Sequence, residues 1–131
     1  MTGRPFFFKV WPLIKEVVMN DKNCIFCKII AKEIPSKIIA ENDDIIGIQD
    51  IAPKAPVHYL IIPKKHIHDV TSLQEEDILI PGKMLMMAKE ISKKLSGSQA
   101  FRLIINNGPD AGQSVFHLHF HFLSGKKMLD F

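Results

Sequence analysis

The run HLHFHFL, residues 117–123, alternates a histidine with an apolar residue, and this alternation constrains the fold more than any other stretch. Successive side chains of a β-strand point to opposite faces, so the run predicts a strand with imidazoles on one face and apolar side chains in the core behind them. The histidines are His117, His119 and His121, and the apolar residues are Leu118, Phe120 and Phe122. With 6 histidines in 131 residues, chance gives such a triplet in roughly 1% of comparable chains. The pattern alone fits a catalytic surface, a metal site or a solvent-exposed polar face.

Composition excludes several classes of protein. At 131 residues and 47% hydrophobic, the chain suits one domain with a substantial core. A formal charge of +3, with no run of lysine and arginine interleaved with aromatic residues, argues against polymeric nucleic acid as a partner. No apolar run reaches the roughly 20 residues that cross a bilayer. We therefore expect a soluble, cytoplasmic protein with no membrane partner.

Residues 1–18 are expected to be an N-terminal extension, poorly ordered or added in expression, that precedes one domain over residues 19–131. A second methionine, Met19, directly precedes the first motif-bearing segment. The apolar stretch of the extension is interrupted by Lys9 and Pro12, and no small-residue cleavage site follows, so it does not predict a secretory signal.

The hydrophobic pattern predicts an α+β fold whose sheet is antiparallel and has about five strands. A short helix is expected over residues 26–33, and a hairpin turn at residues 42–44, where Asn and Asp favour a tight turn. The predicted strands are residues 37–41, 45–51, 57–63, 100–107 and 116–123.

One long helix is expected between Ser72 and Gly97. Ser72 with Glu75 three residues later has the spacing of a capping box, and apolar residues then recur at helical intervals. Pro81 removes a backbone donor inside this stretch, so it is expected to kink the helix or to begin its second part.

Two further segments carry residues that could bind a metal ion or a phosphate. Cys24 and Cys27 are spaced C-x-x-C, which suits metal ligation or a redox pair, although the thiols could also be free. The loop NNGPDAGQSVF, residues 106–116, has glycines that let amides approach an anion, and Gln113 and Ser114 could donate hydrogen bonds to a phosphate. An ordinary turn would have a similar composition.

Taken together, these segments resemble the histidine triad (HIT) family, in particular its bacterial-type nucleotide-binding proteins of the nucleoside phosphoramidase branch. The resemblance rests on HLHFHFL, CIFCKIIAKEIPSKII, DIAPKAPVHYLIIPKKHI and NNGPDAGQSVF, and it extends over residues 23–123. It implies a HIT-like fold with one long and one short helix, and a homodimer. The ending SGKKMLDF departs from branches that finish in a Trp-Pro tail, which bears on substrate preference.

The resemblance implies a covalent mechanism in which His119 is the nucleophile toward the α-phosphorus of a nucleotide. Neutral imidazole is a suitable nitrogen nucleophile near pH 7 when its other nitrogen is held as a donor. The family pattern adds His58 as a supporting histidine from an adjacent strand and places Ser114 near the leaving group. The phosphate is expected to bind His121, Gln113, Ser114 and Asn106. No catalytic metal is implied.

The nucleoside, expected to be a purine, would be bound by residues that have ordinary structural uses as well. Asp50 matches a carboxylate that takes both ribose hydroxyls, whereas its residue type alone indicates a turn or surface position. The residues that match apolar walls around the base are Phe26, Ile29, Ile48 and Ile51, for which plain core packing is the alternative.

The resemblance also implies a structural zinc ion. Its ligands would be Cys24, Cys27, His66 and His117, two thiolates and two imidazoles that would close a tetrahedral site. No role follows for His68, which is expected at the surface.

Three functions therefore stay open. The first is hydrolysis of the P–N or P–O bond in nucleoside 5′-phosphoramidates or acyl-nucleotides through a nucleotidyl-histidine. The second is hydrolysis of dinucleoside polyphosphates with the same nucleophile, and the third is a non-catalytic nucleotide-binding module.

Overall fold

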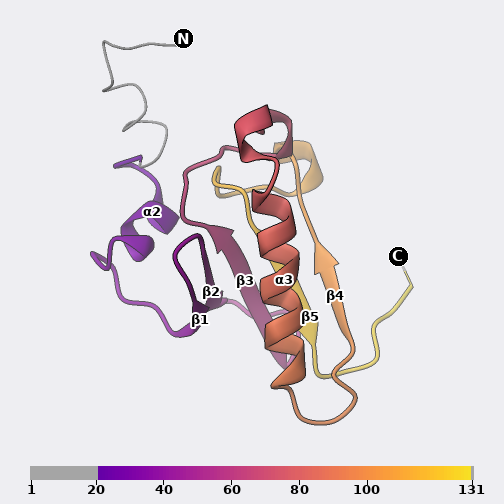
Figure 1. The fold of residues 1–131 in the computed structure, drawn as a ribbon. Helices are drawn as coiled ribbons and strands as arrows, with labels where there is room; N and C mark the ends of the chain where they lie inside the picture. The colour runs from indigo at the N-terminus through magenta and orange to yellow at the C-terminus, as the bar shows by residue number, and fades with distance from the viewer. Residues whose placement is uncertain (1–20, 131) are drawn as a thin grey trace, which may run out of the picture.

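The computed structural model describes residues 21–130, which form one five-stranded antiparallel sheet with helices on its two faces (Figure 1). The sheet order is β1-β2-β3-β5-β4, and all four neighbouring pairs are antiparallel. The predicted extension, residues 1–18, lies outside the described residues. The strands are β1 (Ile38–Glu41), β2 (Ile45–Gln49), β3 (Val57–Pro63), β4 (Phe101–Ile104) and β5 (Phe120–Ser124), and the α-helices are α2 (Ile25–Ile30) and α3 (Ile80–Lys93).

The predicted hairpin is confirmed, and its turn is built by Asn42. The Asn42 side-chain oxygen accepts hydrogen bonds from the main-chain N–H groups of Asp44 and Ile45, each at 2.9 Å. This local bonding gives the chain an alternative to further strand pairing, so it reverses direction between β1 and β2. Gly47 then leaves room for α3, because a Cβ at that position would lie 3.2 Å from Ile91 Cδ1.

Helix α3 begins at Ile80, with Pro81 in its first turn, so the prediction that Pro81 starts a separate helical piece is confirmed. The predicted capping box of Ser72 and Glu75 is wrong. Ser72 ends a short 3-10 helix capped by Asp69, and the capping box joins Gln74 to Asp77 at the next 3-10 helix. The spacing rule selected the wrong pair because Asp69 takes the Ser72 hydroxyl as its own partner.

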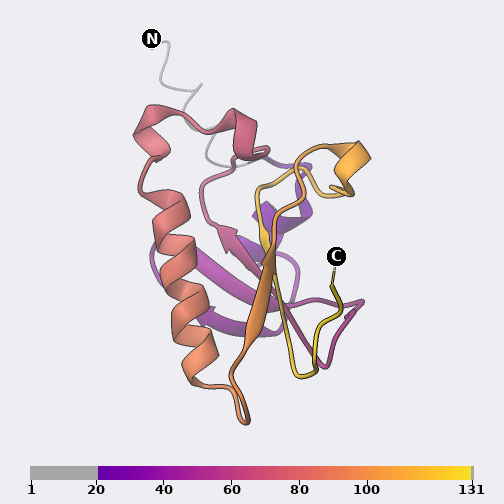
Figure 2. The same ribbon diagram turned by 90° about the vertical axis from the view of Figure 1, so that its right-hand side faces the viewer.

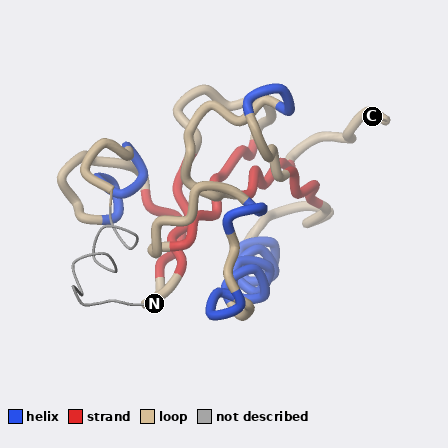
Figure 3. Tube along the Cα trace, turned by 90° about the horizontal axis from the view of Figure 1, so that it is seen from above, coloured by secondary structure: helices blue, strands red, loops and turns tan. Residues whose placement is uncertain are grey.

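The two faces of the sheet carry separate cores. Figure 2 shows α3 on one side of the sheet and α2 on the other. Helix α3 packs its buried residues Met84, Met87, Ala88 and Ile91 against one face, which includes Leu118, Phe120 and Phe122. Helix α2 covers the opposite face, where Phe26 and Ile29 join Ile46, Ile48, Leu60 and Ile62. Seen from above, α3 lies to one side of the strands (Figure 3). In the described part of the chain, no helix combines the length and the apolar character needed to cross a bilayer.

The triad segment differs from its prediction in one respect. Strand β5 begins only at Phe120, whereas the predicted strand begins at residue 116. The neighbouring strand β3 ends at Pro63, and the N–H of Leu118 instead bonds the carbonyl of Ile67 in the following loop. The side chains still alternate between the two faces of the sheet, although residues 117–119 make no strand pairing. The predicted alternative of a solvent-exposed histidine face is wrong, because His117 and His119 are 0% and 8% exposed.

Candidate functional site

Main-chain carbonyls fix the protons of the first two triad histidines. His117 Nε2 lies 2.7 Å from the carbonyl oxygen of Pro63, and His119 Nδ1 lies 2.7 Å from that of His117. Because a carbonyl oxygen only accepts, each of these ring nitrogens carries a hydrogen and donates it. The lone pairs of the neutral rings are therefore on His117 Nδ1 and His119 Nε2.

His119 has the character of a neutral nitrogen nucleophile. Burial lowers the pKa of its imidazole, while its hydrogen bond to His117 acts in the opposite direction. Two rings pack edge-on against it, those of Phe26 and His121, each with centroids 5.1 Å from its own. The ring is thus held in place, uncharged near neutral pH, with a free lone pair on Nε2.

His121 and His58 form a second pair of coupled rings, contributed by paired strands β5 and β3. His58 Nε2 lies 2.9 Å from His121 Nδ1 and 3.3 Å from a carboxylate oxygen of Asp50. On its other side, His58 Nδ1 accepts a hydrogen bond of 2.9 Å from the main-chain N–H of Lys54. Burial lowers the pKa of His58, and burial with the neighbouring histidines lowers that of His121 to about 4. Both rings are therefore neutral at pH 7.

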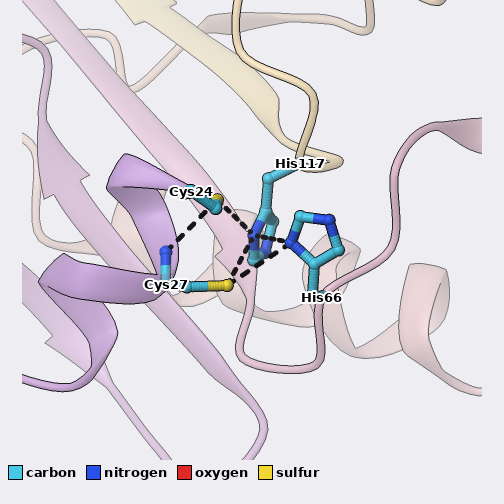
Figure 4. A group of neighbouring side chains, drawn as sticks. All are labelled: Cys24, Cys27, His66 and His117. Atoms are coloured by element: carbon cyan, nitrogen blue, oxygen red, sulfur yellow. Dashed lines mark hydrogen bonds between the residues drawn. The ribbon is translucent and has the colours of Figure 1, made fainter. Parts of the chain in front are cut away.

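The predicted metal ligands Cys24, Cys27, His66 and His117 converge, although they come from segments far apart in the sequence (Figure 4). Their sulfur and nitrogen ligand atoms all lie within 4.8 Å of one another. His117 Nδ1 is 3.3 Å from the sulfur of Cys24 and 3.1 Å from His66 Nδ1. Burial is the main cause that raises the pKa of Cys27 to about 11 and lowers that of His117 to about 4.

The donor set of this cluster fits a zinc ion. The bond to Pro63 leaves His117 Nδ1 without a proton, so its lone pair points at the two sulfurs. His66 Nδ1 lies 3.4 Å from the sulfur of Cys27, and its Nε2 lies 3.8 Å from an Asp21 carboxylate oxygen, so with a proton on Nε2 the Nδ1 atom could bind a cation. Two sulfurs and two nitrogens are the ligand set of closed, tetrahedral zinc sites.

A second group, Asp50, His58 and His121, has ligand-type atoms equally close together but does not fit a metal. For His58 Nε2 to bind a cation, the ring proton would have to be on Nδ1. It would then face the N–H of Lys54 across 2.9 Å, donor against donor. The His58 proton therefore occupies the space that a metal would need.

The loop that precedes the triad is held by its own polar groups. Gly108 and Gly112 have φ angles of 93° and 99°, which favour glycine. The buried Gln113 side chain accepts from the N–H of Gly108 and donates to the carbonyls of His68 and Val115. Its side chain thus braces the loop and is not free to donate to a phosphate.

Two other predicted phosphate ligands lie on the same loop. Asn106 is half-buried, and its side-chain nitrogen lies 3.7 Å from the point that a Cβ on Gly112 would occupy. Ser114 is exposed, and among residues 21–130 none bonds to its hydroxyl. A pocket of about 320 Å³ lies between Ser114 and the cysteine cluster, lined by Asp21, Asn23, Cys24, Ile25, His66, Ser114, Val115 and Phe116.

The predicted nucleoside ligands divide into buried and exposed residues. Phe26, Ile29 and Ile48 belong to the buried core beneath α2, so only their outer atoms could meet a base. Ile51 is 96% exposed and is free to cover one. Asp50 accepts the N–H of Ala52 with one carboxylate oxygen and approaches His58 with the other.

Sequence reasoning missed Lys54, Pro63 and Asp21. Lys54 and Pro63 act through main-chain groups, which no residue type discloses. Asp21 acts on His66, 45 positions along the chain, and no motif links the two. His68, predicted at the surface without a role, is exposed, and its ring stacks on Phe116 at 4.9 Å.

Comparison with known proteins gives consistent results. Residues 23–131 match the family described as scavenger mRNA decapping enzyme C-term binding. The adenylylsulfatase HINT1 of Arabidopsis thaliana is 40% identical over 111 residues, which cover 83% of this chain and 76% of the plant protein. A histidine triad protein from Clostridium difficile has a TM-score of 0.83 and 38% identity, covering 86% of this chain and 99% of its own. A HIT family hydrolase from Clostridium thermocellum has a TM-score of 0.80 and 45% identity, covering 83% and 96%.

Proposed function

The chain belongs to the histidine triad family, and from this premise we propose that it hydrolyses purine nucleotide derivatives at the α-phosphorus through a nucleotidyl intermediate on His119. The family match and the structural neighbours confirm the expected family and its fold. The preferred substrates are nucleoside 5′-phosphoramidates or acyl-nucleotides. The observation that carries the proposal is the hydrogen bond from His119 Nδ1 to the His117 carbonyl, because it leaves the Nε2 lone pair available for attack.

The reaction has two steps. In the first, the Nε2 lone pair of His119 attacks phosphorus, a P–N bond to the ring forms, and the leaving group departs with the electron pair of its bond and takes up a proton from solvent. In the second, water attacks phosphorus and releases a proton to solvent, and the P–N bond breaks with its electron pair returning to Nε2. His121 donates a hydrogen bond from Nε2 to a phosphate oxygen, since its Nδ1 accepts from His58.

Substrate contacts are proposed for residues around this pair. The hydroxyl of Ser114 faces the leaving group, and Asn106 supplies an amide to the phosphate. Gln113 supports the same loop from beneath through its bonds to Gly108 and Val115. Asp50 accepts the two ribose hydroxyls, and Ile51 covers the exposed side of the base, with Phe26, Ile29 and Ile48 forming the floor.

We also propose that Cys24, Cys27, His66 and His117 hold a structural zinc ion. A bound zinc would neutralise the two thiolates and tie α2 to the segment that carries the nucleophile. A reducing compartment such as the cytoplasm keeps both thiols available for this use.

A homodimer is proposed through the edge of the sheet. In the described sheet, β4 is an end strand that pairs only with β5, and its Phe101 is exposed. Leu85 and Met86 are exposed on the outer side of α3. A second copy that covered these surfaces would pair an open strand edge and bury apolar area. The molar mass in solution tests this proposal.

The experiment compares the wild type with His119→Ala on an adenosine 5′-phosphoramidate, adenylyl sulfate and a diadenosine polyphosphate. Adenylyl sulfate is included because the plant relative is named an adenylylsulfatase. We expect the wild type to hydrolyse the phosphoramidate fastest, and His119→Ala to lose at least about 10⁴-fold in kcat/KM while retaining nucleotide affinity. A rapid-quench mass spectrum of the wild type should show one added nucleotidyl group, absent from the variant.

The other functions give different results in the same experiment. Fastest turnover of the diadenosine polyphosphate would identify a dinucleoside polyphosphate hydrolase with the same nucleophile. A wild type that binds adenosine monophosphate but hydrolyses none of the three compounds would refute the enzymatic proposal and indicate a binding module.

A further inference from the structure

The segment between β2 and β3, residues 50–56, contacts His58 at three points. The main-chain N–H of Asp50 bonds the carbonyl of His58 at 2.9 Å, and the N–H of Lys54 bonds its ring at Nδ1, also at 2.9 Å. A carboxylate oxygen of Asp50 lies 3.3 Å from the other ring nitrogen. The histidine is 3% exposed, so these protein groups replace solvent around most of the ring.

These contacts remove an ambiguity that a pair of histidines otherwise has. In a bond between His58 Nε2 and His121 Nδ1, either ring could supply the proton. The amide of Lys54 can only donate, so Nδ1 of His58 must accept and its single proton must be on Nε2. His58 then donates to His121, whose own proton is on Nε2.

We propose that Lys54 is a positioning residue that acts through its main-chain amide. By fixing the proton of His58, the amide presents His121 as a hydrogen-bond donor toward the phosphate. The role of His121 as a donor to the phosphate rests on the proposed function, whereas the proton positions on His58 and His121 do not. The Lys54 side chain is exposed and is not required.

The opposite arrangement would be harmful to the reaction. With the proton of His58 on Nδ1, His121 would donate from Nδ1 and turn a lone pair on Nε2 toward the substrate. His119 already directs a lone pair at phosphorus, so neither ring would donate a hydrogen bond to the phosphate oxygens or stabilise their charge. The Lys54 amide therefore determines whether His121 Nε2 presents a hydrogen-bond donor or a lone pair to the phosphate.

The test compares Lys54→Pro, which removes the N–H, with Lys54→Ala, which keeps it. In full-length protein with ¹⁵N-labelled histidine, NMR at pH 7 reports which nitrogen of each ring is protonated. The wild type and Lys54→Ala should show His58 and His121 protonated on Nε2. Lys54→Pro should show a mixture of tautomers at His58 and His121, and a raised pKa of His58, because Nδ1 becomes free to take a proton beside Asp50 and the neutral His121.

Turnover of the phosphoramidate supplies the second readout. Lys54→Pro should lose at least about tenfold in kcat relative to Lys54→Ala, with KM within about twofold, because the lost interaction is strongest in the transition state. Similar thermal midpoints of the two variants exclude a general loss of structure.

The spectrum of the wild type alone can overturn the proposal. A proton on Nδ1 of His58 would do so even if Lys54→Pro does not fold. Equal kcat and equal tautomers in the two variants would also overturn it. If the wild type has no turnover, the proposed function fails, and the spectra still decide whether the amide fixes the two rings.

Discussion

Two clusters of ligand-type side chains differ in the main-chain group that bonds the far side of a histidine ring in each. In the cluster of Cys24, Cys27, His66 and His117, the Pro63 carbonyl accepts a hydrogen bond from His117 Nε2, so the Nδ1 lone pair faces the cluster. In the cluster of Asp50, His58 and His121, the Lys54 amide donates to His58 Nδ1, so the proton on Nε2 faces the cluster. The first is a candidate metal site and the second is a hydrogen-bond relay, although both bring ligand atoms within 4.8 Å of one another.

The comparison shows that residue type and proximity do not define a metal site. A neutral imidazole has one donor and one acceptor nitrogen, so the group bonded to one nitrogen determines what the other can do. His119 follows the same rule as His117: a carbonyl behind the ring leaves a lone pair in front. The structure uses the main chain in this way at three histidines, His58, His117 and His119.

The largest effect that separates the clusters is expected from Cys27→Ser. Serine is a poor zinc ligand, so the variant should lose the single zinc per chain that we expect in the wild type. If free zinc is about 1,000-fold above its dissociation constant, the loss lowers the free energy of unfolding by about 4 kcal/mol and Tm by roughly 10–20 °C. Metal analysis and thermal unfolding measure both quantities.

The matched control for this variant is the wild type in chelator, which should have a similar Tm. Asp50→Asn and His58→Asn should keep one zinc per chain. A second equivalent of zinc in the wild type, lost on substitution of His58, would contradict the distinction between the clusters.

These distinctions lie beyond what the sequence could provide. The alternation of residues 117–123 correctly predicted which side chains face the α3 core, because that depends on local geometry alone. The start of β5 was missed, because it depends on main-chain partners: the β3–β5 ladder stops at the pair Ile61–Phe120, and the N–H of Leu118 bonds the carbonyl of Ile67 instead. Family resemblance assembled the four zinc-type ligands, and the structure brings them together.

Proton positions were not predictable by either route. They depend on main-chain partners such as the Lys54 amide and the Pro63 carbonyl, whose location follows from the folded loops and not from residue type. Gln113 shows the same limit, because its side chain proved to be engaged by the loop that it was expected to serve.

The next largest effect concerns acid, to which the two clusters should respond differently. Burial and neighbouring rings hold the pKa of His121 at about 4 in the folded chain, against 6.5 for an unperturbed histidine. Between these values the unfolded chain binds more protons, so stability is full above pH 6.5 and declines as pH falls toward 4, by at most about 3 kcal/mol for this ring.

Urea unfolding of the zinc-saturated wild type and of His121→Asn at pH 7 and pH 5 measures the contribution of His121. The variant should be less stable at pH 7, because it lacks the bond to His58, but it should lose less stability on acidification. Parallel losses in the two proteins would show that His121 does not titrate as its burial implies. Metal content recorded at each pH separates this effect from loss of zinc, since protons compete for thiolate and imidazole ligands.

The smallest expected effect is that of Asp50→Asn on nucleotide binding, and it separates two roles of this carboxylate: binding the substrate and bonding His58. Asp50 has two uses, as the proposed acceptor for ribose hydroxyls and as a neighbour of His58 Nε2 at 3.3 Å. Hydrogen bonds to a charged acceptor contribute about 1.5–3 kcal/mol, so the variant should bind adenosine monophosphate roughly 10- to 100-fold more weakly. A 2′,3′-dideoxy analogue, which lacks both hydroxyls, should bind the two proteins equally, as titration calorimetry can measure. If Asp50→Asn weakens binding of the analogue as much as binding of the ribonucleotide, then Asp50 supports the histidine pair and does not bind the ribose. Its carboxylate would then belong to the relay that the Lys54 amide orients.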